Sequence, residues 1–283
     1  MSASRHGWRR GWRRGWRRVS WIGLLIGFSA AVDGTARAQS PSQADDLARQ
    51  LSNPVASLIS IPLQSNLTQG YGSLGAWRNT LNIQPVIPIR LNDDWNLISR
   101  TILPIIWRPR THVGDPSTTG LGDVTASLFL SPSRPINGLT LGVGPVFVLP
   151  TATDPLLGAG KWGVGLTGLV LHQTKTMTIG MMANHIWSLA GPANREEVSN
   201  TLLQPFIAFP LGEGRTLSVN TESNYDWVHR QWTVPINVQL SQVMKLGGQM
   251  LSVAAGPQIY VVKPTGGPSW GLRFSLTFLF PEK

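Results

Sequence analysis

The last strand-like segment of the chain, 270–280, restricts the possible folds more than any other feature. Its large apolar side chains stand at every second position from Trp270 to Phe280, and small or polar side chains from Gly271 to Thr277 fill the positions between them. Successive side chains of a β-strand point to opposite faces. The segment therefore predicts a strand with one apolar face and one hydrophilic face.

The same alternation recurs upstream at a regular spacing. Segments of about 10 residues with period two, separated by turn residues, are typical of transmembrane β-barrels, and bacterial single-chain barrels have an even number of strands. We therefore predict an all-β fold, an antiparallel up-and-down transmembrane β-barrel of about twelve strands. The predicted strands are 57–68, 78–91, 95–107, 122–131, 139–150, 161–173, 176–188, 200–210, 215–227, 231–243, 250–262 and 270–280. The prolines inside them are expected at bulges or strand ends, namely Pro85, Pro88, Pro104, Pro145, Pro205, Pro235 and Pro257.

The rest of the sequence offers no other way to cross a membrane. Beyond residue 38 there is no uncharged apolar run of about 18 residues, the length that a membrane-spanning helix needs. A closed barrel is the other structure that satisfies every backbone polar group inside lipid.

The first 38 residues carry a large part of the positive charge. Eight of the 24 Lys and Arg residues lie there with one acid, Asp33, whereas the remaining sequence carries 16 basic and 13 acidic residues. WRR repeats, an apolar run at 21–31 and a small-x-small site at 36–38 predict a secretory signal peptide, residues 1–38. Alternatively, the Arg/Trp repeats bind nucleic acid or an anionic membrane surface. Arg17-Arg18 also resembles a twin-arginine signal, but that route carries folded cargo.

Residues 39–56 are predicted to form a periplasmic N-terminal extension before the barrel, 57–283. The stretch 44–51 lacks Gly and Pro, which allows a short helix. A simple extension is favoured over a helix that plugs the barrel.

The connections between the predicted strands differ in length on alternate sides. Barrels of this class have short periplasmic turns and longer outer loops. The segments 92–94, 173–175, 211–214 and 245–249 are short, and 132–138 is the longer turn. The opposite connections, 69–77, 108–121, 151–160, 189–199 and 263–269, are mostly longer, with 228–230 as the exception.

Tryptophans lie at or beside the ends of the predicted strands. An interfacial girdle of aromatic side chains marks the membrane boundary in such barrels. The girdle predicted at the outer rim consists of Trp77, Trp107, Trp162, Trp187, Trp227, Trp232 and Trp270, and Trp95 falls at the opposite end. A soluble barrel or sandwich would instead place its tryptophans mid-strand and inward.

Charged residues on the hydrophilic parity of the strands are the candidates for lining the lumen. A charge at bilayer depth is tolerated where it lines a wet or paired interior. The candidates are Arg90, Arg100, Asp123, Glu222, Asp226 and Arg273, with Glu222 placed to pair with Arg273 or Arg90. Such charges either select a solute or hold the barrel together.

Other chemistries receive little support from the sequence. The absence of cysteine excludes disulfides and thiolate metal sites. His185 and Ser188 are the best candidates for a lipid hydrolase, but a separation of three in a regular strand puts them on opposite faces. The histidines are scattered, and Asp115 and Asp123 bracket a loop in which Ca²⁺ is a weaker alternative to plain solvation. We expect no catalytic residues, no metal and no cofactor.

Several segments resemble a known family. They are NPVASLISIPLQ at 53–64, GLGDV at 120–124, the segment 142–165 that includes GVGPVFVLPTATDP, ANHIWS at 183–188, NTESNYDW at 220–227, QWTVPINV at 231–238 and GGPSWGLRFSLTFLFP at 266–281. They are similar to a bacterial outer-membrane barrel family of transporters, related to the meta-pathway phenol-degradation group and often mislabelled neuromedin U. The resemblance implies a transport role and suggests small aromatic or hydrophobic solutes.

Together these observations predict an integral protein of the bacterial outer membrane that passes small solutes passively. A barrel of twelve strands lies between the side-chain-filled barrels of eight strands and the open ones of sixteen or more, so a narrow pore is geometrically possible. The alternative is a closed-lumen barrel with a structural or adhesive role. The expected partners are membrane lipids, a small-molecule solute and the barrel-assembly machinery, with no nucleic acid, and the expected state is a monomer.

Overall fold

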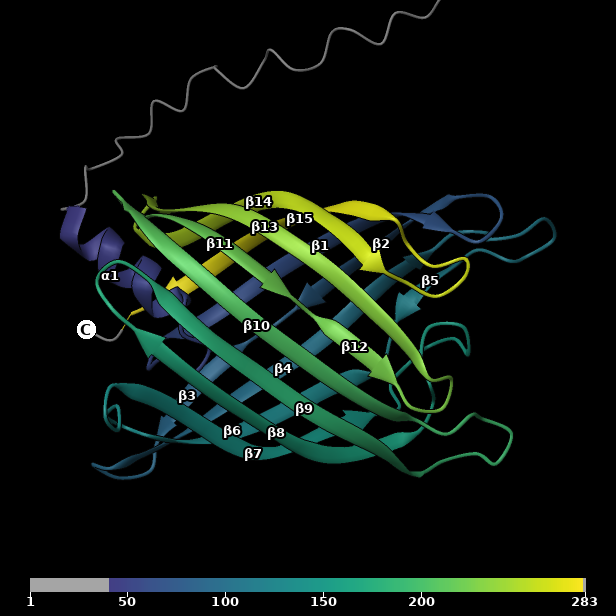
Figure 1. Ribbon diagram of the computed structural model, residues 1–283, viewed down its shortest axis with the longest axis horizontal. Helices are drawn as coiled ribbons and strands as arrows, with labels where there is room; N and C mark the ends of the chain where they lie inside the picture. Colours follow the sequence, from purple (N-terminus) through teal and green to yellow (C-terminus); the bar gives the residue numbers. More distant parts are fainter. Residues whose placement is uncertain (1–40, 282–283) are drawn as a thin grey trace, which may run out of the picture. The chain divides into compact units, whose positions relative to one another are not determined.

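The computed structural model describes residues 41–281, so the predicted signal peptide lies outside the described residues. One short helix precedes a single antiparallel sheet that closes on itself (Figure 1). The elements are α1 (Pro41–Leu51), β1 (Ile59–Tyr71), β2 (Ala76–Ile83), β3 (Val86–Arg90), β4 (Trp95–Arg108), β5 (Thr118–Leu121), β6 (Val124–Pro132), β7 (Leu139–Leu149), β8 (Trp162–Gln173), β9 (Thr178–Ala190), β10 (Ser199–Gly212), β11 (Arg215–Thr221), β12 (Ser223–Asp226), β13 (Gln231–Leu246), β14 (Gln249–Val262) and β15 (Trp270–Phe280).

Three pairs of these segments are single strands with a short interruption, so the barrel has the twelve strands predicted from the sequence. β2 continues as β3, β5 as β6 and β11 as β12. Pairing of β1 with β15, from Ile59 opposite Phe280 to Gln69 opposite Trp270, closes the barrel. Closure leaves no free sheet edge along this seam, which is what a strand structure in lipid requires.

Several of the prolines lie at or beside the interruptions of strands rather than at strand ends. Pro85 lies between β2 and β3, and a register shift falls at Pro235, as expected for residues without a backbone donor. The other five prolines lie within assigned strands, so the expectation of bulges or ends is wrong for them. Pro104 and Pro205 instead stand beside interruptions in the neighbouring strand, at residues 122–123 and at Glu222.

The two ends of the barrel differ, as the predicted alternation requires. Tight connections at 91–94, 174–177, 213–214 and 247–248, with the longer 133–138, form what we call the turn end. The loop end carries 72–75, 109–117, 150–161, 191–198, 227–230 and 263–269. The connection at 72–75 is tighter than the predicted 69–77, because β1 continues to Tyr71 and Gly72 and Gly75 adopt the positive φ of a sharp turn.

The outside of the barrel is apolar. Large side chains of one parity are exposed on neighbouring strands, for example Val143, Leu166, Leu240 and Phe274. The predicted girdle tryptophans all lie near the loop end with 38% to 54% exposure, and Trp95 lies at the turn end. A continuous apolar exterior bounded by aromatic side chains is the surface of a barrel in a bilayer.

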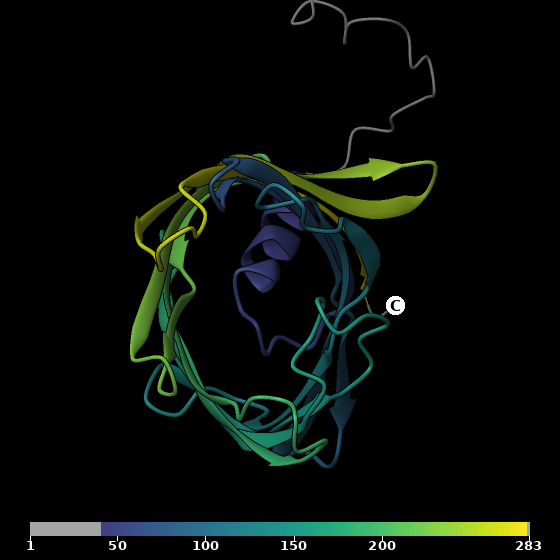
Figure 2. The ribbon, with the colours of Figure 1, turned by 90° about the vertical axis from the view of Figure 1, so that its right-hand side faces the viewer.

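Helix α1 occupies the mouth of the barrel at the turn end. Figure 2 looks in from the loop end and shows α1 within the ring of strands. Its apolar face packs on inward side chains of the wall in one cluster of Ala44, Leu47, Ala48, Leu58, Val243, Met250 and Leu279. The expectation of a simple extension is therefore wrong for this segment, because the spacing of these apolar positions gives the helix a stripe that must be buried.

The hairpin at 213–214 is shaped to receive this helix. Glu213 and Gly214 both have positive φ, as a two-residue hairpin requires. The Gly214 N–H donates to the Asp45 carboxylate at 2.6 Å, and a Cβ on Gly214 would lie 2.9 Å from the Ala44 Cβ. At the C-terminal end of α1, Gln173 Nε2 donates to the Arg49 carbonyl at 2.8 Å. Among the described residues, no helix is long and apolar enough to span a membrane.

Candidate functional site

The lumen contains a cavity of about 1060 Å³ that extends from the loop end to the middle of the barrel. At the loop end it is lined by Thr265 and His229, and its deepest part reaches Arg100. About half of the lining residues are uncharged polar side chains of the inward parity: Gln64, Asn66, Thr68, Thr80, Asn82, Gln84, Thr125, Ser127, Asn184, Asn200, Gln204, Asn224, Gln231, Thr233 and Gln258. A lumen lined in this way can hold water, as the polar interiors of such barrels do.

An ion pair crosses the cavity at mid-depth. Arg273 of β15 donates two hydrogen bonds to the Glu222 carboxylate, from Nη1 at 2.7 Å and Nη2 at 2.8 Å. Arg273 Nε also donates to Asn66 Oδ1 of β1 at 2.6 Å, so the guanidinium ties the closing seam to the strand formed by β11 and β12, which is separated from β15 by β13 and β14. Such a two-point contact between planar groups is stronger and more directional than a single hydrogen bond.

Arg100 lies deeper, on β4, and has weaker partners. Its Nη2 donates to Gln84 Oε1 at 3.2 Å, and its Nη1 lies 3.5 Å from the Met182 sulfur. A thioether is a poor acceptor. In the described part of the chain, no carboxylate lies within 4.0 Å of this guanidinium.

Below Arg100 the lumen changes from polar to apolar. Inward side chains from several strands and one residue of the N-terminal segment form a buried cluster: Val55, Ile98, Phe129, Leu169, Leu171 and Met182, with Val86, Leu202 and Phe206 packed against it. A smaller cavity of about 170 Å³ lies between residues 50–58 and the wall, and Arg100, Gln84, Met182 and Gln204 line both cavities. The N-terminal segment and this cluster fill much of the turn end.

At the loop end a histidine joins two loops. His229 contacts the Asp226 carboxylate through Nδ1 at 2.8 Å and the Glu196 carboxylate through Nε2 at 3.0 Å. Both ring nitrogens donate only when the imidazole is protonated. The hydrogen bond to Asp226, with the negative charge of both carboxylates, raises the pKa of His229 above its usual value.

The longest outer loop is fixed by contacts on both sides. The Asp123 carboxylate accepts the backbone N–H groups of Ala152 at 3.1 Å and Gly160 at 3.0 Å. From the neighbouring loop, Arg195 Nε donates to the Ala159 carbonyl at 2.8 Å. Its Nη2 donates to the Pro155 carbonyl at 3.0 Å.

Below this contact, a lysine and an acid join the same two loops. The buried Lys161 pairs with Glu197, and Ser188 Oγ donates to the same carboxylate. These hydrogen bonds, that from Lys161 first, hold the pKa of the Glu197 carboxyl below its usual value.

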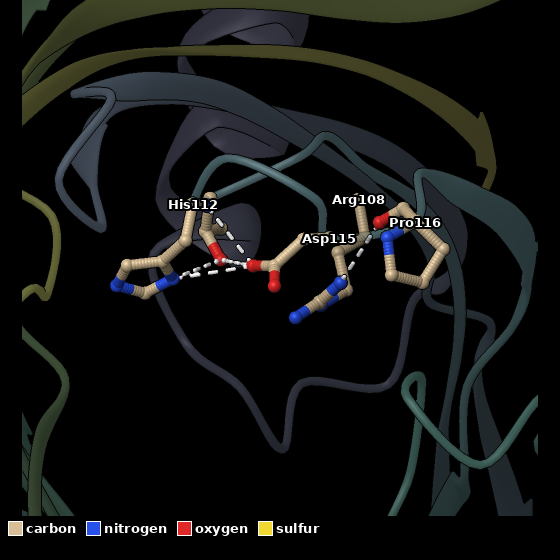
Figure 3. Close-up of polar contacts among 5 residues, drawn as sticks. Arg108, His112, Asp115 and Pro116 are labelled. Atoms are coloured by element: carbon tan, nitrogen blue, oxygen red, sulfur yellow. Dashed lines mark hydrogen bonds and ion pairs between the residues drawn. The ribbon is translucent and has the colours of Figure 1, made fainter.

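The loop 109–117 has its own polar cluster (Figure 3). Asp115 accepts hydrogen bonds from Thr111 Oγ1 at 2.7 Å and from the His112 backbone N–H at 3.0 Å. The hydrogen bond from Thr111, followed by that from the His112 ring, lowers the pKa of the Asp115 carboxyl. Because the carboxylates of Asp115 and Asp123 are each bound within different loop contacts, they do not share a site. Within residues 41–281, no group of three or more His, Asp or Glu side chains is arranged to hold a metal ion.

The prediction that all six charges line the lumen is wrong for Arg90 and for Asp123, whose carboxylate is held by the backbone of the outer loop 150–161. Arg100, Glu222, Asp226 and Arg273 line the cavity, and Glu222 pairs with Arg273 rather than with Arg90. Arg90 ends β3 at the turn end, where its exposed side chain pairs with Asp93. Arg90 has the parity of an inward-facing residue, but it is the last residue of its strand, so its long side chain reaches past the strand end into solvent.

His185 and Ser188 do not form a catalytic pair. His185 forms a hydrogen bond with Thr201 Oγ1 at 2.6 Å, and its ring packs at a tilt against Trp187, with ring centroids 4.1 Å apart. Ser188 is bonded instead to Glu197 and to the Val198 N–H.

Two features of the lumen were missed by sequence reasoning. The inward apolar side chains at the turn end, such as Phe129 and Leu171, break the rule of apolar outside and polar inside. They accompany the buried N-terminal segment, so the amphipathic stretch 44–51 was the available signal. The loop contact through His229 had a local signal, an Asp three residues before a His in a tight turn.

The comparisons agree with the architecture. No protein-family model matches the sequence, and no curated protein matches it either. An outer membrane channel from Pseudomonas putida F1 is structurally similar, with a TM-score of 0.60 and 17% identity over 78% of this chain and 93% of that chain.

Two other solved barrels are more distant. The KdgM porin has a TM-score of 0.44 and 10% identity over 79% of this chain and 99% of its own. Outer membrane phospholipase A from Escherichia coli has a TM-score of 0.48 and 10% identity over 78% of this chain and 90% of its own. The likeness to the channel establishes the fold and nothing finer. The protein therefore has the fold of an integral β-barrel of the bacterial outer membrane.

Proposed function

We propose that this barrel is a channel for the passive passage of small solutes across the outer membrane. The observation that carries the proposal is the polar cavity of about 1060 Å³, bounded by the strands of one chain and lined at mid-depth by an ion pair. Because one chain encloses the cavity, we propose that the monomer is the functional unit. The family resemblance of the sequence favours small aromatic or hydrophobic solutes. The lengths of the connections favour an orientation with the longer loops at the cell surface and the short turns in the periplasm.

The N-terminal segment supports a second candidate. Helix α1 and the apolar cluster fill the turn end, which suits a closed barrel with a structural or adhesive role. The two functions differ in whether the turn end opens.

Single-channel recording in planar bilayers distinguishes these candidates. We expect the full-length mature protein to give small, discrete conductance steps, and a variant lacking residues 41–57 to give larger ones, since the deletion removes α1 and Val55 from the lumen. A variant of the exposed turn, Arg90→Gln, is the control and should conduct as the wild type does. Silence of both the full-length protein and the deletion variant would exclude a channel and favour the structural role.

A further inference from the structure

Building on the proposed channel function, we propose that the lumen contains a binding site for a small monocarboxylate with an apolar body. Its carboxylate pairs with Arg100, and its apolar part enters the cavity of about 170 Å³ beneath. Four observations carry this inference: the weak partners of Arg100, the charge balance around it, the apolar surface below it, and its place between two cavities.

The guanidinium of Arg100 lies between apolar neighbours with donors to spare. On the same face of β4, the adjacent inward residues are Ile98, which is fully buried, and Ile102. Its acceptors among the described residues are one amide oxygen and one thioether sulfur. Removing a charge from bulk water is costly unless the charge is paired, so this position favours an anion that brings its own acceptors.

The neighbouring carboxylates are engaged with other partners and do not pair with Arg100. Glu222 lines the same cavity above Arg100, but both of its oxygens accept hydrogen bonds from Arg273. Of Arg100, Glu222 and Arg273, one positive charge is therefore uncompensated. Asp226 is engaged at the mouth with His229.

The chemistry of the site selects a carboxylate. A guanidinium presents N–H groups in a planar fork that matches the two oxygens of a carboxylate. A single negative charge balances the single uncompensated positive charge. A doubly charged phosphate would bring a second charge, and within residues 41–281 the cavity lining has no Lys or Arg besides Arg100 and Arg273 to balance it.

The surface beneath Arg100 suits an apolar group. The apolar part of the small cavity is formed by Leu51, Ala56, Leu58, Val86, Met182 and Phe206, with Pro54 and Pro62, and six polar or charged side chains, among them Arg100, line the rest. An apolar cavity of about 150 Å³ is large enough to bind benzene. A ring or a short alkyl chain attached to the carboxylate can therefore occupy it while the carboxylate stays at Arg100.

Isothermal titration of the full-length protein in detergent tests the site with benzoate, benzyl alcohol and acetate as probes. We expect benzoate to bind about tenfold more tightly than either other probe, because benzyl alcohol lacks the charge and acetate lacks the apolar body. Arg100→Gln should weaken benzoate binding by about tenfold and leave benzyl alcohol binding unchanged, and Arg100→Lys should fall between Arg100→Gln and the wild type.

Two further variants isolate the two halves of the site. Ala56→Leu fills the small cavity, so it should weaken benzoate binding and leave acetate binding unchanged. This variant tests the site independently of whether Arg100→Gln folds. Arg90→Gln makes the same charge change at the exposed turn and should bind all three probes as the wild type does. Equal benzoate affinity in the wild type and Arg100→Gln, or benzyl alcohol binding as tight as that of benzoate, would overturn the proposal.

The same proteins in planar bilayers separate this inference from the channel function. If the barrel conducts but shows no Arg100-dependent benzoate binding, the proposed channel function stands and the proposed binding site is wrong. If the barrel binds benzoate through Arg100 but never conducts, even without residues 41–57, the proposed binding site stands and the proposed channel function is wrong.

Discussion

Glu222 stands at the interruption between β11 and β12, beside Pro205 and Pro235 of the flanking strands. Prolines supply no backbone donor, so the ladder is weakened where this side chain enters the lumen. The side chain of its partner, Arg273, is only 3% exposed, whereas that of Glu222 is 31% exposed. The ion pair thus bridges a local weakness in one wall to the closing seam at β15 and β1.

Removing the charge of Glu222 should leave Arg273 without a balancing anion. We expect Glu222→Gln to lower the free energy of unfolding by about 1–3 kcal/mol, less than for a pair buried in a dry interior because the lumen holds water. Urea unfolding in lipid vesicles, followed by tryptophan fluorescence, measures the change. Glu213→Gln disrupts the exposed pair with Arg215 and should unfold like the wild type. Coincident unfolding curves for Glu222→Gln and the wild type would contradict the prediction.

At the scale of elements, the loop end is organised by contacts between neighbouring loops. His229 joins the loop 227–230 to Glu196 of the loop 191–198, and Arg195 extends the contact to the loop 150–161. These loops border a second cavity of about 470 Å³ at the entrance to the lumen, which shares Val198, Asn200, Asp226 and His229 with the main cavity. We therefore predict that the width of this entrance depends on the charge of His229.

The raised pKa of His229 gives this contact a defined pH dependence. Since the folded-state pKa lies above the usual 6.5, the stabilisation is fully present below pH 6.5 and is lost as pH rises through the folded value. We expect spin labels on Asn194→Cys and Arg230→Cys to be closer, with a narrower distance distribution, well below pH 6.5 than well above it. In His229→Gln the distance should no longer change with pH. A pH-dependent distance that persists in His229→Gln would show that another group controls the loops.

At the scale of the whole molecule, the sequence predicted the wall of the barrel far better than its interior. The inward and outward faces of strands such as 270–280 can be predicted from local alternation, because lipid outside favours apolar side chains and water inside favours polar ones. Contacts across the lumen join residues distant in sequence, as Arg273 joins Glu222, and parity alone left Arg90 as an equal candidate. The burial of α1 depends on a cavity that exists only once the barrel has closed.

These interior contacts make the lumen polar at the loop end and apolar at the turn end. A small polar reagent that enters from the loop end should reach Asn200, which lines both the main cavity and the entrance, but should be stopped before Leu171, which is 1% exposed in the apolar cluster. The chain has no cysteine, so single-cysteine variants report on each depth without a background reaction.

We expect a charged methanethiosulfonate reagent, added to intact cells, to modify Asn200→Cys at least about tenfold faster than Leu171→Cys, because an apolar cluster disfavours a charged group. Deleting residues 41–57 should speed modification of Leu171→Cys and leave that of Asn200→Cys unchanged, since the deletion removes Val55 from the cluster. Leu166→Cys, on the apolar exterior, is the control and should not react within the bilayer. If the deletion leaves Leu171→Cys unreactive, the wall side chains alone close the turn end, and the N-terminal segment is not the barrier.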